Sequence, residues 1–200
     1  SFPLLHFKDL SGLPGVRLIS LHKGDGEEQL KGLPQDMRIE TLGEDFDSGP
    51  NGFFDTAAVI KCLDLVITSD TAVAHLAGAL GAPVWVALKS APDWRWMMGR
   101  DDSPWYPTLR LFRQPKAGDW AAVFAQMRRD AIGTGSFSQK CGAQRIRPSH
   151  APCVAQRCNM VNIDAQSLLI TQSHRPISLM TGLKPAVAFA RFLCLINTML

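Results

Sequence analysis

The sequence has no apolar run long enough to cross a membrane. Its most apolar C-terminal stretch is divided by Arg191 into residues 186–190 and 192–196, and each part is far shorter than the roughly 20 residues of a spanning helix. A glycine-rich fingerprint for a dinucleotide pyrophosphate is also missing, which argues against a generic dinucleotide-binding fold. Before residue 133 the only cysteine is Cys62, as is typical of a reducing cytoplasm, where we place the protein.

Acidic residues almost vanish after residue 132. Residues 133–200 contain 7 Lys and Arg but only one acid, Asp164, whereas the first 132 residues carry 14 basic and 17 acidic side chains. The same stretch holds four of the five cysteines and no tryptophan. A break of this kind indicates a domain boundary, so we divide the chain into a body, 1–132, and an irregular basic C-terminal tail, 133–200.

Three interpretations of the tail compete. A basic module for nucleic acid or anionic lipid is disfavoured because the cations are scattered without interleaved aromatic residues, and we predict no nucleic-acid partner. A metal site would use Cys153 and Cys158 with a neighbouring cysteine or histidine, but zinc ligands are usually spaced more tightly and repeated. We favour the third interpretation, in which the tail is disordered or arises from read-through or a shifted reading frame.

The most informative segment of the body combines two buried strands with a helix. Residues 65–67 and 84–88 are short, continuous apolar runs rich in β-branched residues, which is typical of parallel strands covered on both faces. Between them, residues 71–80 form a helix of small apolar residues, with Asp70 or Thr71 as its N-cap. Gly81 suits the left-handed position that closes such a helix.

The polar turn before this helix predicts a ligand site. In open α/β sheets ligands bind outside the carboxyl ends of the strands, and the first N–H groups of a helix favour an anion. His75 lies one turn beyond Thr71 on the same face of the helix. Two interpretations of His75 stay open at this point: a core histidine bonded to a nearby carbonyl, or a contact to phosphate. Asp70 alone would usually be only a cap.

The remaining segments predict a doubly wound, Rossmann-like α/β domain with a parallel sheet. Strands are expected at 15–21, 38–42 and 110–114, the last with Phe112 inward and its arginines outward. A short helix is expected to start at 27–30, and residues 43–52 to form an acidic loop. Two longer helices follow their N-caps, one at 56–63 after Asp55 and one at 120–129 after Asp119, the latter burying Ala122, Val123 and Met127.

Residues 1–132 resemble the donor-binding half of the family 9 glycosyltransferases, the heptosyltransferase-like group with the GT-B fold. The resemblance is carried by residues 70–86, DTAVAHLAGALGAPVWV, and by the later segments 92–96, 102–107 and 110–114. It is closer to a bacterial subset that carries tetratricopeptide repeats upstream. At 19–24 the sequence resembles the family's Ser-Leu-Gln-Lys strand end, with His22 in place of the usual glutamine.

The resemblance implies a set of donor-binding residues. Backbone N–H groups of Thr71 and Ala72 would hold the diphosphate of a nucleotide-sugar donor, and Asp70 would face the sugar hydroxyls. His75 would contact the phosphate region. Ser20 and Lys23 would lie across the same site, with Lys23 neutralising the diphosphate leaving group. Where heptosyltransferases have glycine, this chain has Ala72, whose methyl group narrows the approach of the phosphate.

A tryptophan-rich stretch after the predicted strand 84–88 has two interpretations. The rings of Trp94 and Trp96 either stack on a sugar or base or pack a long loop against the sheet. Arg95 would reach a phosphate or an acceptor carboxylate. We therefore include Trp94 and Arg95 among the expected substrate-binding residues.

Together these features predict the donor domain of a glycosyltransferase that moves a sugar from a nucleotide diphosphate to an acceptor hydroxyl. We expect no metal and no other cofactor, because a helix N-terminus with Lys23 and His75 can hold the leaving diphosphate. The acceptor domain and the catalytic base are expected upstream of Ser1, so we predict an N-terminally truncated fragment that is inactive alone. The alternative is a non-catalytic nucleotide-binding or scaffolding domain attached to tetratricopeptide repeats.

Overall fold

The computed structural model describes residues 2–50, 52–133 and 191–196. The strands are β1 (Val16–Ser20), β2 (Ile39–Thr41), β3 (Leu65–Ser69), β4 (Val84–Leu88), β5 (Leu109–Arg113) and β6 (Arg191–Ile196). The α-helices are α1 (Lys8–Ser11), α2 (Phe54–Ile60), α3 (Ala72–Ala79) and α4 (Trp120–Gly133). Short 3-10 helices lie at η1 (Leu4–Phe7), η2 (Glu27–Gly32) and η3 (Trp94–Trp96).

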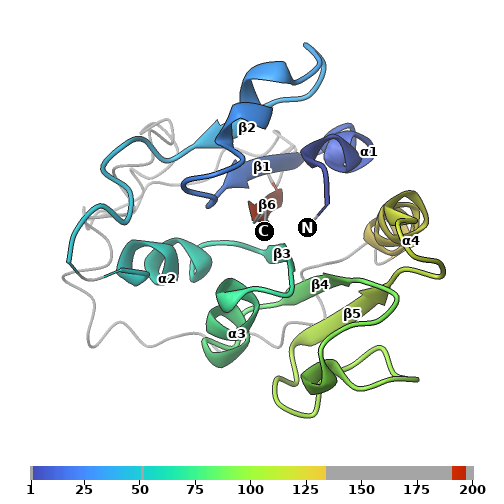
Figure 1. Cartoon of the computed structure of the whole chain (residues 1–200). Coiled ribbons are helices and arrows are strands. Elements are labelled where there is room, and N and C mark those ends of the chain that lie inside the picture. Colours follow the sequence, from blue (N-terminus) through green and yellow to red (C-terminus); the bar gives the residue numbers. More distant parts are fainter. Residues whose placement is uncertain (1, 51, 134–190, 197–200) are drawn as a thin grey trace, which may run out of the picture.

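The strands form one parallel sheet in the order β2-β1-β6-β3-β4-β5. Figure 1 shows α1 and α4 along one side of this sheet and α2 and α3 along the other. A parallel sheet with helices on both faces is the Rossmann-like α/β architecture, so the predicted fold class is confirmed.

Each face of the sheet carries its own hydrophobic core, because successive residues of a strand point to opposite faces. In β3 all five residues are buried. Leu65 and Ile67 join the core that contains Phe124 of α4. Val66, between them, joins the other core, with Ala74 of α3. The two cores fix β3 between the helical layers and thereby set where its last residues end.

The predicted strand–helix–strand unit is confirmed. β3 and β4 pair in register from Val66 with Val84, and α3 connects them. Thr71 is the N-cap residue, with extended backbone. Gly81 has φ of 69°, the left-handed conformation predicted for it, which a residue without a Cβ adopts readily.

The predicted N-cap of α2 is wrong. The helix begins at Phe54, after Phe53 in the left-handed conformation, so Asp55 lies in its first turn. The side-chain acceptor for the helix comes from Asp47, whose Oδ1 receives the N–H of Asp55 at 3.0 Å. The physical reason is that a helix N-terminus requires an acceptor, which a preceding loop can supply as well as the adjacent residue.

The cap of α4 is as predicted, since Asp119 Oδ1 accepts the N–H of Ala122 at 3.0 Å. Val123 and Met127 are buried against the sheet, whereas Ala122 is only half-buried. Phe112 is buried as predicted. Arg113, expected to face outward, instead donates from Nη2 to the carbonyl of Trp96 at 2.6 Å, because the loop after β4 folds back beside β5.

The sequence analysis does not predict β6. This strand lies between β1 and β3 and pairs in parallel with both, with Leu193 opposite Leu18 on one side and Leu65 on the other. It therefore occupies a central position in the sheet. The interpretation of the rest of the tail falls on 134–190 and 197–200, outside the described residues, and stays a prediction, as does the boundary at 132.

Within the part of the chain that the structure describes, no helix combines the length and the apolar character needed to cross a membrane.

Candidate functional site

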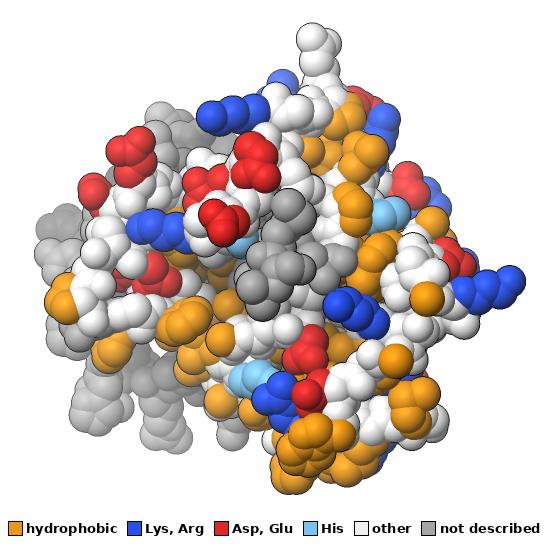
Figure 2. Space-filling model, in the orientation of Figure 1, with side chains coloured by type: hydrophobic (Ala, Val, Ile, Leu, Met, Phe, Trp, Pro, Cys, Tyr) orange, Lys and Arg blue, Asp and Glu red, His pale blue; other side chains and the backbone are white. Residues whose placement is uncertain are grey.

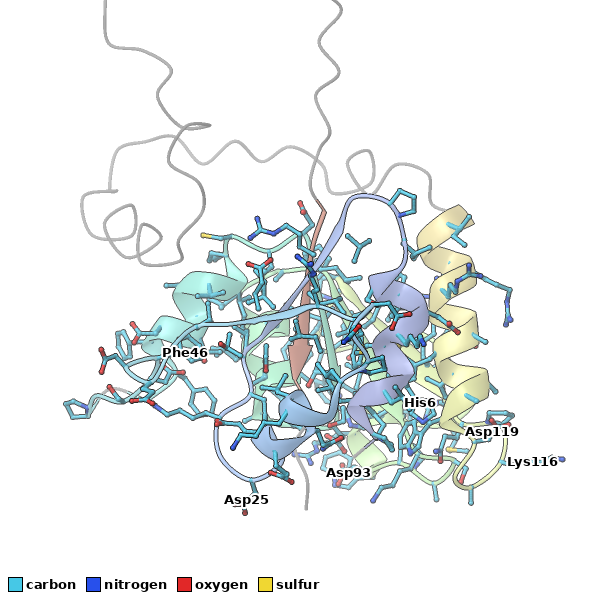
Figure 3. The ribbon with its side chains drawn as sticks, turned by 90° about the horizontal axis from the view of Figure 1, so that it is seen from above. His6, Asp25, Phe46, Asp93, Lys116 and Asp119 are labelled. Carbon is cyan, nitrogen blue, oxygen red and sulfur yellow. The ribbon has the colours of Figure 1, made fainter. Side chains whose placement is uncertain are left out.

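The candidate site lies at the carboxyl edge of the sheet. Because all strands are parallel, the loops that follow them emerge at the same edge. Figure 3 shows Asp25, Asp93 and Asp119, from the loops after β1, β4 and β5, at the lower edge, toward which the arrowhead of β6 points. Most of the residues predicted to bind substrate lie at this edge.

The turn after β3 leaves the start of α3 without a side-chain cap. Thr71, the N-cap residue, makes no cap hydrogen bond, because its Oγ1 lies 3.0 Å from Oγ1 of Thr68. Asp70 and Ala72 on either side are exposed. Backbone N–H groups at the first turn of a helix need an external acceptor, and anions are favoured there.

His75 is held by two aromatic side chains. Its ring stacks on Trp96, with centroids 5.2 Å apart and planes 18° apart. Its Nδ1 lies 3.1 Å from the hydroxyl of Tyr106. His75 is half-buried and bonds to a phenol rather than to a carbonyl, so it is not the core histidine of the first interpretation, and the contact to phosphate stays a prediction.

The loop after β4 brings an ion pair to the same place. Arg95 Nε lies 2.8 Å from Asp93 Oδ1. Hydrogen bonds from the backbone N–H and side chain of Arg95 hold the pKa of Asp93 below its ordinary value, and the charge of His75 adds to this lowering. The side-chain hydrogen bond to Asp93 and the charge of that carboxylate raise the pKa of Arg95, and the charge of Asp70 contributes. These interactions join the turn after β3, the helix α3 and the β4 loop into one cluster.

The two tryptophans of this loop have opposite environments. Trp96 is 1% exposed and belongs to the core, whereas Trp94 is 76% exposed. Trp105 is also half open to solvent and donates its Nε1–H to the carbonyl of Arg95 at 3.1 Å. The packing interpretation therefore holds for Trp96, and the ring of Trp94 is free to stack on a ligand. Figure 2 shows exposed apolar side chains beside acidic, basic and histidine side chains on this part of the surface.

Ser20 and Lys23 are not brought to this cluster by any described contact. Ser20 is buried, and its Oγ accepts the N–H of His22 at 3.3 Å. Lys23 Nζ donates to the carbonyls of Glu44, at 3.2 Å, and Phe46. Because β6 separates β1 from β3, the ends of those two strands are about 10 Å apart. Lys23 thus secures the loop after β2, at the same edge but on the other side of β6.

Sequence analysis missed two features of the site. The first is Tyr106, which lies 31 positions from His75 in the sequence and within the segment 102–107. A signal was available in Gly78, since a glycine inside a helix costs about 1 kcal/mol relative to alanine and so points to a packing reason. A Cβ at Gly78 would lie 2.5 Å from Cγ of Tyr106.

The second overlooked feature is an Asp-x-Asp sequence, Asp45-Phe46-Asp47, of a type that can bind a divalent cation through carboxylate oxygens. In the structure the Asp47 carboxylate is occupied by α2: it accepts from the N–H of Asp55 at 3.0 Å and from the hydroxyl of Thr56. Among the described residues no group of three or more His, Cys, Asp or Glu side chains is placed to hold a metal ion.

Comparison with known proteins relates one region of this α/β sheet to a known family. The sequence profile of the family described as Glycosyltransferase family 9 (heptosyltransferase) matches residues 16–88, which run from the start of β1 to the end of β4. The match supports glycosyltransferase family 9 for this region of the chain.

A particular relative is similar over a longer stretch. The protein FlbA of Caulobacter vibrioides is 32% identical over 125 residues, which are 62% of this chain and 20% of FlbA. The chain therefore spans about a fifth of the length of that relative. No solved structure matches the chain.

Proposed function

We propose that this chain is the donor-binding part of a glycosyltransferase and that the carboxyl edge of its sheet binds a nucleotide-diphosphate sugar. The observation that carries the proposal is the coincidence of the family match with the site. Residues 16–88 contain β1, β3 and α3, and so include the uncapped turn at Asp70 and Thr71 together with His75.

The diphosphate would lie against the first turn of α3. The N–H groups of Ala72 and its neighbours supply donors, and the positive end of the helix favours the charge. His75 adds a donor from the same helix. The exposed Asp70 carboxylate is suited to accept from sugar hydroxyls, since a carboxylate is an acceptor only.

The ends of the donor would meet the loop after β4. Trp94 presents an exposed ring on which a base or a sugar can stack. Arg95, although paired with Asp93, keeps N–H groups of its planar fork for a phosphate oxygen. Holding a leaving diphosphate by helix dipole, imidazole and guanidinium is a means of stabilising developing charge in sugar transfer.

The parent reaction would transfer the sugar to an acceptor hydroxyl, in a cytoplasmic, bacterial protein. The catalytic base and the acceptor-binding residues would come from a further domain, attached to tetratricopeptide repeats. On this proposal the chain binds donor but does not turn it over, and no metal is needed for binding.

Calorimetric titration of the full chain with ADP, GDP and UDP, with and without Mg²⁺, tests the proposal. We expect saturable binding of one nucleotide, independent of Mg²⁺ and about tenfold weaker in His75→Ala, which loses one hydrogen bond to a charged group. Asp36→Asn is the matched control, because Asp36 is exposed in the loop before β2, at the opposite edge. A folded chain that binds none of the three would instead favour the scaffolding alternative.

A further inference from the structure

Tyr106 is the one tyrosine of the chain, and its hydroxyl reaches the ring of His75 at 3.1 Å from Nδ1. The two rings also meet edge to face, with centroids 5.8 Å apart and planes 62° apart. The contact joins α3 to the loop before β5.

The Tyr106 ring packs against α3 at Gly78. Gly78 is buried, and a Cβ at this position would lie 2.5–2.9 Å from ring atoms Cγ, Cδ1 and Cδ2 of Tyr106. Such distances are well inside van der Waals contact between carbon atoms. The glycine therefore lets the ring lie flat on the helix, one turn beyond His75, where its hydroxyl meets the imidazole.

The hydrogen bond decides which ring nitrogen is available. A neutral imidazole has one N–H donor and one acceptor nitrogen. When the phenol donates to Nδ1, the imidazole proton resides on Nε2. No described residue hydrogen-bonds to Nε2. Its N–H can therefore donate to an acceptor atom of a bound ligand.

Stacking on Trp96 restricts rotation of the His75 ring without forming a hydrogen bond to Nε2. Trp96 covers one face of the imidazole and is itself fixed in the core at 1% exposure. An imidazole that is stacked, hydrogen-bonded at Nδ1 and open at Nε2 is preorganised to bind an anion.

We infer that Tyr106 is a positioning residue for the anion contact of His75: it rests on Gly78, donates to Nδ1, and so fixes the Nε2–H tautomer that binds the diphosphate. This inference rests on the proposed donor-binding function. Tyr106 acts only through His75 and needs no contact with the nucleotide.

The tautomer can be tested without any ligand. Long-range ¹H–¹⁵N NMR spectra of the imidazole nitrogens distinguish the two neutral forms. We expect Nε2–H for His75 in the unsubstituted chain at pH 8 and a shift toward the mixed population of a free imidazole in Tyr106→Phe. Gly78→Ala, which displaces the ring while keeping the hydroxyl, should give the same shift. Trp105→Phe, next to Tyr106 in sequence, should not.

A double-mutant cycle with the nucleotide that binds tightest tests the coupling. Tyr106→Phe should weaken binding about fivefold and His75→Ala about tenfold, whereas the double variant should bind like His75→Ala alone. Additive losses, or a His75 tautomer unchanged in Tyr106→Phe, would overturn the inference. If the unsubstituted chain binds no nucleotide, the proposed function fails, and the NMR spectra still decide whether Tyr106 sets the tautomer.

Discussion

Asp47 and Asp55 bond reciprocally across the loop between β2 and α2, each carboxylate accepting the backbone N–H of the other residue. Asp47 Oδ1 accepts the Asp55 N–H at 3.0 Å, and the Asp47 N–H donates to Asp55 Oδ2 at 3.2 Å. Asp47 itself has φ of 48°, a conformation that aspartate tolerates better than most residues. The pair closes the acidic loop onto the start of the helix.

Asp47→Ala should therefore lower the free energy of unfolding by about 1–2 kcal/mol, the usual cost of losing a helix cap. Urea denaturation followed by circular dichroism measures the change. The neighbouring Asp45→Ala is the matched control, because it alters the same Asp-x-Asp sequence but removes no cap, and should cost less than about 0.5 kcal/mol. Equal losses in the two variants would contradict the assignment.

From the central position of β6 we predict that the stability of the protein depends on this strand. A proline in the middle of a sheet removes a ladder hydrogen bond, and Leu193 pairs with residues of both β1 and β3. We expect Leu193→Pro to lower the free energy of unfolding by about 3 kcal/mol or more. Lys116→Pro, in the exposed loop after β5, should cost far less in the same urea titration.

A truncated chain provides an independent check on β6. Ending the chain after Gly133 leaves the facing edges of β1 and β3 without their shared neighbour, so the urea midpoint should fall. A synthetic peptide of residues 190–197 should restore it with saturable dependence on concentration, and a scrambled peptide should not. A truncated chain as stable as the full one would show that the strand adds nothing to the fold.

We expect the free energy of unfolding to depend on pH through His6. Its ring stacks on Phe124, with centroids 5.4 Å apart, and burial lowers the pKa of His6 below its ordinary value of 6.5. The unfolded chain therefore takes up this proton more readily than the folded one. Stability from His6 is present above pH 6.5 and is lost as the pH falls toward the folded pKa.

Urea titrations between pH 5 and pH 8 measure this contribution. In His6→Gln the fall in unfolding free energy below pH 6.5 should be shallower than in the unsubstituted chain. His22→Gln, in an exposed loop, is the matched control. Parallel pH profiles for the unsubstituted chain and His6→Gln would refute the prediction.

Arg113 secures the loop that carries the exposed tryptophan. Its Nη2 donates to the carbonyls of Trp96, at 2.6 Å, and of Met97, and burial lowers the pKa of its guanidinium. Arg113→Met should lower the free energy of unfolding by about 1–3 kcal/mol, because two carbonyls lose a charged donor.

Hydrogen exchange followed by mass spectrometry locates the effect of Arg113→Met. Amides of residues 93–100 should exchange faster, while those of β3 keep their protection. Arg110→Met, which breaks the ion pair of Arg110 with Asp130 on α4, is the control and should leave the loop unchanged. Unaltered exchange at 93–100 in Arg113→Met would mean that other contacts hold the loop.

What could be predicted from the sequence is local. β3, α3 and β4 are encoded in adjacent residues, by β-branched runs, small helical residues and the left-handed Gly81, and these elements are confirmed. The cap of α2 could not be found in this way, because its acceptor belongs to Asp47, eight positions before Asp55. A prediction that considers only the adjacent residue chooses Asp55.

Tertiary contacts account for the rest of what was missed. Trp94 and Trp96 occur in one short segment, yet only the packing of the loop distinguishes an exposed ring from a core one. The pairing of His75 with Tyr106 depends on two elements that meet in space. β6 is not predicted, because its residues follow a stretch whose composition differs from that of the body.

The central position of β6 also affects the order in which the protein can fold during synthesis. The neighbours of β6 in the sheet, β1 and β3, belong to the first 69 residues, whereas β6 begins at residue 191. The ribosome adds roughly 5–20 residues per second, so the nascent sheet keeps an unfilled gap for several seconds. Contacts so distant in sequence also slow folding. During that interval the open edges of β1 and β3 can pair with other chains, so we expect the yield of native protein to depend on the rate of translation.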